Sequence, residues 1–102
     1  KITHVDIKES HYTWDRENPE RRQDYDGNYR ELCSFLKHYS ATNNVESVTT
    51  HGSWGEYGNL DHTLVHHACL ASFDCPVNGM DPATYRAAKN VYKKFGVWTW
   101  YF

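Results

Sequence analysis

The stretch Leu60-Asp-His-Thr-Leu-Val-His-His-Ala-Cys-Leu-Ala-Ser-Phe73 decides which fold this sequence predicts. Its second half is almost continuously apolar, which is typical of a strand covered on both faces at the centre of a sheet. Residues 45–53, just upstream, are β-branched and polar, as expected of an edge strand. Between them lies Trp54-Gly-Glu-Tyr-Gly-Asn59, whose two glycines favour a hairpin turn. The middle of the chain is therefore predicted to be a β-hairpin.

Both ends of the chain are also predicted to be strands. In residues 2–14, Val5 and Ile7 alternate with polar neighbours, which is the period of a strand with one buried face. Residues 97–102 read Val-Trp-Thr-Trp-Tyr-Phe, with three large aromatic side chains at alternate positions. Such a segment is typical of a strand.

Two amphipathic helices are predicted between these strands. Residues 24–40 place apolar side chains at steps of three and four. Asn18-Pro19 is an earlier helix start of the preferred type, although Gly27 weakens a continuous helix from there. Asp81-Pro82 predicts the start of the second helix, and Gly96 predicts its end.

The predicted order of elements is strand, helix, strand, strand, helix, strand. This is the ferredoxin-like split βαβ plan (βαββαβ) of the α+β class, a four-stranded antiparallel sheet with both helices on one face. Residues 1–102 are expected to form a single domain, since the chain is of ordinary domain length. The helices leave one sheet face uncovered, so we expect a partner, a second copy or the N-terminal segment to cover its aromatic side chains.

Charge and hydropathy limit the classes of function. The formal net charge of −2 argues against a protein whose main task is binding nucleic acid, which usually needs a basic face. No apolar run approaches the roughly 20 residues of a transmembrane helix. The basic side chains of the second predicted helix, which include Arg86, Lys89, Lys93 and Lys94, are explained by a solvated helix face or by contact with an acidic partner.

The three cysteines, Cys33, Cys69 and Cys75, allow one disulfide and one leftover thiol, or three reduced thiols. A helix packed on the third strand brings Cys33 near either of the others. We favour a Cys33–Cys75 disulfide, because the segment before Pro76 can adjust to disulfide geometry. No Cys-x-x-Cys pair is present, so we expect no thiolate metal site and no cofactor.

Histidines are the strongest candidates for chemistry. On a strand, His62 and His66 share a face but lie about 13 Å apart, too far to bind one metal ion together. On a helix, the same spacing makes a good metal pair. The alternative chemistry is a ribonuclease-like hydrolase, in which general acid and base would come from the residues that flank the hairpin, His51, Glu56, His62 and His66.

The predicted topology, the chain length, the odd number of cysteines and a first residue other than Met resemble one group of proteins. These are the small secreted βαββαβ proteins of fungi, namely the virally encoded killer toxins and the plant-pathogen effectors that share their fold. The first residue, Lys1, is what we expect of a processed or trimmed chain. The resemblance implies a secreted, extracellular virulence protein that binds a target of another organism, at its cell surface or inside its cells, and catalyses no reaction.

We therefore expect a toxin-like or effector-like binding protein, more consistent with a binder than with an enzyme. Its partner would be a protein or cell-surface target, and its binding surface would include the aromatic residues Trp54, Tyr57, Trp98 and Trp100. Two alternatives remain open: the histidine-based hydrolase, and a homodimeric ferredoxin-like domain that closes its open sheet faces against each other.

Overall fold

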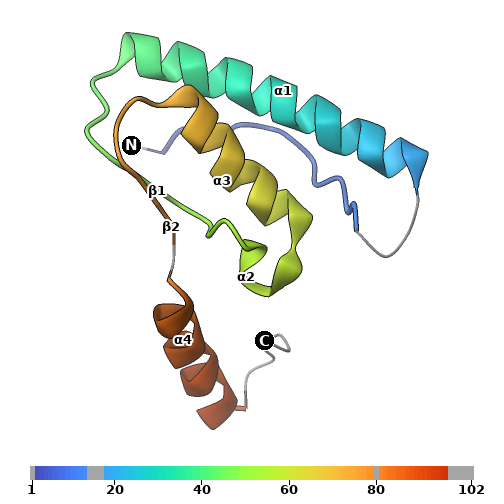
Figure 1. The fold of residues 1–102 in the computed structure, drawn as a ribbon, viewed down its shortest axis with the longest axis vertical. Helices are drawn as coiled ribbons and strands as arrows, with labels where there is room; N and C mark the ends of the chain where they lie inside the picture. Colours follow the sequence, from blue (N-terminus) through green and yellow to red (C-terminus); the bar gives the residue numbers. More distant parts are fainter. Residues whose placement is uncertain (1, 14–17, 80, 97–102) are drawn as a thin grey trace.

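A computed structural model describes residues 2–13, 18–79 and 81–96 of the chain (Figure 1). Its elements, in chain order, are α1 (Pro19–Thr42), β1 (Val48–Thr50), α2 (Gly55–Gly58), α3 (Leu60–Ser72), β2 (Val77–Gly79) and α4 (Pro82–Lys94). Helices α1 and α3 pack along each other, while α4 lies at the end of the molecule away from α1. The described chain is thus a mixed α+β structure dominated by helices.

The predicted four-stranded antiparallel sheet is wrong. The sheet that the described residues form has two short strands, β1 and β2, and they run parallel, with Val48 opposite Val77 and Thr50 opposite Gly79. Parallel strands need a crossover connection, and here α2 and α3 supply it. Residues 2–13 form no strand, and the predicted strand over 97–102 lies outside the described residues.

The stretch that was predicted to be the central strand is helix α3 instead. The side chain of Asn59 caps this helix by accepting hydrogen bonds from the backbone N–H groups of Asp61 and His62, at 2.9 and 3.3 Å. Leu60, Leu64 and Ala68 recur every four residues and are all buried. A 13-residue stretch whose apolar side chains carry this period is satisfied by a helix, because one face then enters the core.

The two predicted helices are confirmed, and α1 begins earlier than the 24–40 segment. Asn18 is its N-cap, and the Asn18 side chain accepts a hydrogen bond from the backbone N–H of Arg21 at 3.0 Å. Gly27 lies within α1 without ending it. The start of α4 is set by Asp81, whose side chain accepts from the Thr84 backbone N–H at 2.9 Å.

The core lies where α1 meets α3, and the N-terminal segment is pinned beside it. Cys33 on α1 and Cys69 on α3 are both buried there. Asp61, in the first turn of α3, accepts hydrogen bonds from the Ser10 hydroxyl at 2.6 Å and from the His11 backbone N–H at 3.1 Å. Because these are hydrogen bonds to an acidic side chain that bridge residues about fifty positions apart, they hold residues 10–11 against the start of α3.

Candidate functional site: the groove between α1 and α3

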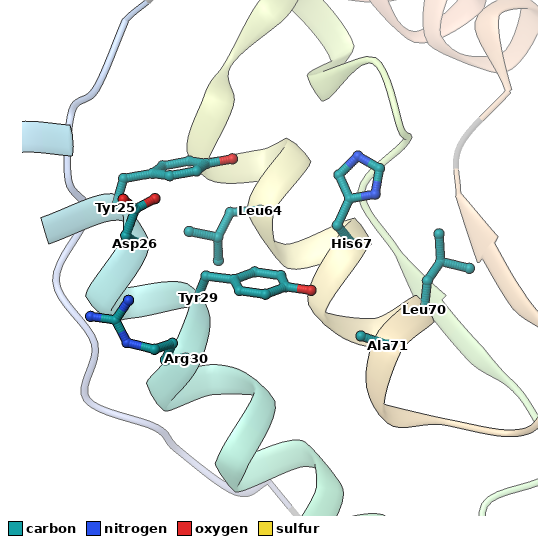
Figure 2. A pocket seen from close by; sticks show the side chains of 8 residues that line it. All are labelled: Tyr25, Asp26, Tyr29, Arg30, Leu64, His67, Leu70 and Ala71. Carbon is teal, nitrogen blue, oxygen red and sulfur yellow. The ribbon is translucent and has the colours of Figure 1, made fainter. Parts of the chain in front are cut away.

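A groove of about 630 Å³ runs between α1 and α3 (Figure 2). We call it the α1–α3 groove. Four of its lining residues come from each helix: Tyr25, Asp26, Tyr29 and Arg30 from α1, and Leu64, His67, Leu70 and Ala71 from α3. Figure 2 shows both tyrosine rings reaching from α1 across towards α3.

Helical spacing explains why these residues meet. Tyr25 and Tyr29 lie one turn apart on α1 and therefore share a face. On α3, Leu64, His67 and Ala71 follow one another at steps of three and four, which places them on one side of that helix. The tyrosine stripe of one helix thus faces a mixed apolar and imidazole stripe of the other.

The two tyrosines bring neutral hydroxyl groups to the groove, close to the apolar side chain of Leu64. Burial, followed by the negative charges of Asp61 and Asp26, raises the pKa of Tyr25. A hydrogen bond with the Cys33 thiol, followed by burial, raises the pKa of Tyr29. Both phenols therefore stay protonated at neutral pH and can each donate or accept a hydrogen bond.

The rim of the groove is open to water and carries both signs of charge. Asp26 and Arg30 are exposed on the α1 side, and His67 and Ala71 are exposed on the α3 side. Leu70 is also 51% exposed, which is high for a leucine at the edge of a groove. The site combines an aromatic floor, an exposed aliphatic side chain and a charged edge, which suits recognition of another surface.

The predicted aromatic binding residues lie elsewhere. The half-buried Trp54 precedes α2, and its ring meets the ring of Tyr85 edge to face, with centroids 4.7 Å apart. Tyr85 belongs to α4 and is almost fully buried. Trp54 is therefore part of the contact that attaches α4. The side chain of Tyr57, and all of Trp98 and Trp100, lie outside what the structure describes.

Three of the four histidine-site residues are brought together at the end of β1. The rings of His51 and His62 stack with centroids 3.9 Å apart and planes only 6° from parallel. The buried His66 ring has its Nδ1 atom 2.7 Å from the carbonyl oxygen of His51, and since a carbonyl only accepts, this nitrogen donates. The side chain of Glu56 is not among the described ones.

The stacking of the His51 and His62 rings bears on the ribonuclease-like alternative. A ribonuclease-like site needs its general acid and base on either side of the scissile phosphate. Rings in face-to-face contact, as in His51 and His62, leave no space between them for that group. Among the described residues, no group of three or more histidine, cysteine or acidic side chains is arranged to hold a metal ion.

All three cysteines are free thiols in this structure. Cys33 and Cys69 are buried at the α1–α3 contact, and Cys75 is half-buried after α3. Burial raises the pKa of Cys69, and the nearby Cys33 adds to this shift. The Cys33–Cys75 disulfide stays a prediction.

Sequence reasoning did not find the α1–α3 groove, although part of its signal was visible. The predicted helix over 24–40 already placed Tyr25 and Tyr29 on one face. Their facing residues depend on the 60–73 stretch being a helix, because a strand would turn Leu64 and His67 to opposite sides. The wrong assignment of that stretch therefore hid the site.

Comparison of the chain with protein-family models, with curated proteins and with solved structures finds no match. None of the helices that the structure describes is long and apolar enough to cross a membrane. What the protein does is therefore inferred from the chemistry of its own surfaces.

Proposed function

We propose that this protein is a binding protein that holds a segment of another protein in the α1–α3 groove, without catalysing a reaction. The observation that supports this proposal is the composition of the groove: two half-buried tyrosines, an arginine and a half-exposed leucine around the buried Leu64. Tyrosine and arginine are enriched among residues that dominate protein–protein binding energy. An aliphatic side chain at the edge adds area that a partner can cover.

The open rim favours a protein segment over a small molecule. Small-molecule sites bury most of the ligand surface, whereas five of the eight residues that line this groove are exposed. A groove between two packed helices fits the mode in which an amphipathic segment lays its apolar side chains into a groove. Asp26 and Arg30, one turn apart on α1, then offer both charges to the polar flank of that segment.

The wider expectation of a secreted toxin or effector rests on the resemblance, and the strand order on which that resemblance mainly stood is absent from the described residues. Secretion and action on another organism therefore stay predictions. The proposal of a protein-binding groove is independent of them, because it depends only on the side chains of α1 and α3.

The proposal is tested by selecting peptides from a random display library on the full chain. Selected peptides are then titrated by fluorescence anisotropy against the wild type and two variants. Leu70→Asp places a charge at the groove edge, and Val91→Asp places the same charge on α4, where the side chain is equally exposed at 52%, against 51% for Leu70. We expect peptides with apolar positions at helical spacing, and at least about tenfold weaker binding to Leu70→Asp alone.

Two results would refute the proposal. One is a library that yields no peptide able to compete for a common site. The other is a set of peptides whose binding is unaffected by Leu70→Asp, or is weakened as much by Val91→Asp. Circular dichroism of both variants checks that the helices are intact, and neither substitution enters the buried core.

A further inference from the structure

Helix α4 has two chemically different faces, and its apolar face is not fully used by the rest of the described chain. At 100° per residue, five side chains occupy an arc of about 120° on α4 and its C-cap: Tyr85, Ala88, Val91, Tyr92 and Phe95. Arg86, Lys93 and Lys94 are exposed and lie outside this arc. The Pro82–Lys94 sequence contains no acidic residue.

Only the first half of the apolar face is covered within the described chain. Tyr85 is buried against Trp54, and Ala88 is half-buried. Towards the end of the helix, Val91 is 52% exposed and Phe95 is 74% exposed. In Figure 1, α4 extends away from α1 and α3, and no described helix or strand packs broadly along it. The free end of α4 therefore presents apolar and basic side chains together.

We propose that this free end of α4 docks on an anionic lipid surface, with Val91 and Phe95 entering the headgroup boundary and Lys94, at the edge of the apolar arc, contacting acidic headgroups. Lys93 and Arg86 lie on the polar side of the helix and add longer-range attraction to the negative surface. A helix with an aromatic and aliphatic face and a basic face on the other side lies in the plane of a membrane interface. The helix is too short and too polar to span a membrane, which agrees with a position on the surface. This surface is separate from the α1–α3 groove.

A lipid surface fits α4 better than an acidic protein does, because two kinds of contact are needed at once. The three exposed cations complement a negative surface, and each cation near an anionic membrane contributes about fivefold to binding. The exposed phenylalanine and valine need an apolar environment as well, which a merely acidic partner does not supply.

The test is co-sedimentation of the full chain with vesicles, in about 100 mM NaCl so that distant charges are screened. Vesicles of phosphatidylcholine alone are compared with vesicles that also contain about 30% phosphatidylserine. We expect binding to the anionic vesicles only, and release as the salt concentration is raised. Since the salt and lipid dependence are measured on the wild type, they do not depend on any variant folding.

Two variants locate the binding surface. Lys93→Glu with Lys94→Glu should weaken the partition to anionic vesicles by at least about 30-fold, because each lost cation costs about fivefold and the two factors multiply. Arg22→Glu with Lys37→Glu is the matched control, because it makes the same change in net charge on exposed positions of α1. The control should weaken binding by less than about threefold. Phe95→Ser should cost about tenfold without any change in charge.

Three outcomes would overturn the inference. The first is no sedimentation of the wild type with anionic vesicles. The second is equal binding to vesicles with and without phosphatidylserine. The third is an equal loss in the α4 variant and the α1 control, which would place the interaction elsewhere. Capture of the wild type by immobilised polyglutamate, without vesicle binding, would assign α4 to an acidic protein partner instead. Because Leu70→Asp should leave vesicle binding unchanged, this inference and the groove proposal fail separately.

Discussion

The substitution Leu64→Ala, compared with Leu70→Ala, tests the central feature of this fold. In helix α3, Leu64 faces the core and is 4% exposed, whereas Leu70 is 51% exposed at the groove edge. On a central strand of the predicted sheet, both leucines would be covered, because positions 64 and 70 share a face and both faces are packed. The helix therefore predicts unequal costs for the same chemical change, and the strand predicts similar ones.

The magnitude follows from what each change removes. Leu→Ala deletes three carbon atoms, which are worth about 0.8 kcal/mol each when they are fully buried, or roughly 2.5 kcal/mol. Leu64 also borders the groove, so part of the space that it leaves is open to solvent and the cavity term stays small. We expect a total of about 3 kcal/mol. Leu70 loses about half as much transfer free energy and leaves no cavity, and we expect about 1 kcal/mol.

Urea unfolding followed by circular dichroism at 222 nm measures both values. With a slope of about 1.5 kcal/mol per molar urea, Leu64→Ala should lower the midpoint by about 2 M, and Leu70→Ala by about 0.7 M. Equal shifts for the two variants would contradict a helix over Leu60–Ser72 with this buried face. A larger shift for Leu70→Ala would contradict the placement of α3 against α1.

Three further predictions concern other parts of the chain. Gly79→Ala should destabilise the protein by about 1–3 kcal/mol in urea unfolding, because a Cβ atom at Gly79 would stand 2.8 Å from the Cα atom of Gly52. Hydrogen bonds at the start of α4 lower the pKa of Asp81 below its ordinary value of 3.8. The carboxylate therefore stabilises the folded protein above pH 3.8, and this stabilisation is lost as the pH falls through the lowered pKa. Asp81→Asn keeps a capping side chain that does not titrate, so the variant should not show this part of the loss of helicity in acid. Alkylation of the folded protein near pH 8, read by peptide mass spectrometry, should label Cys75 before Cys69, because Cys69 is buried and burial raises its pKa.

Each of these predictions has its own control and its own contrary result. Gly27→Ala, where nothing lies within 4 Å of the added Cβ, should raise stability by up to about 1 kcal/mol; a neutral Gly79→Ala would show that the close approach is not kept in solution. An unchanged acid profile in Asp81→Asn would contradict the capping role of the carboxylate. Alkylation of Cys69 as fast as Cys75 would mean that the α1–α3 contact opens readily, and denatured protein serves as the reference for full labelling.

The local signals in the sequence were sufficient for two of the helices. Asp81-Pro82 and Asn18-Pro19 each combine a capping side chain with a proline in the first turn, and both mark real helix starts. Such signals work because the cap and the helix it serves lie within three residues of each other, so the interaction does not depend on the rest of the fold. The interpretation of Gly27 as a weak point did not matter, because α1 is long and packed along α3.

The 60–73 stretch was misassigned because apolar content alone does not distinguish a buried strand from a buried helix. Two features of the sequence favoured the helix. The stretch is longer than most strands, and Asn59 stands where a helix N-cap is preferred. The spacing of four between Leu64 and Ala68 agrees with a helix and with a strand alike, because it puts both side chains on one face of either element. Since the α1–α3 groove needs side chains of α3 on one helical face, the wrong assignment removed the site together with the fold.

The sequence by itself determined the caps Asn18 and Asp81, the extent of α4, the extent of α1 apart from its first five residues, and the basic, aromatic character of α4. These depend on contacts between residues close in the chain. Only the tertiary structure decided that β1 and β2 pair in parallel, that Asp61 holds Ser10, and that the tyrosines of α1 face Leu64. Each of these joins residues about thirty or more positions apart, and the free energy that selects such contacts comes from burial and packing across the whole molecule, which no local pattern encodes.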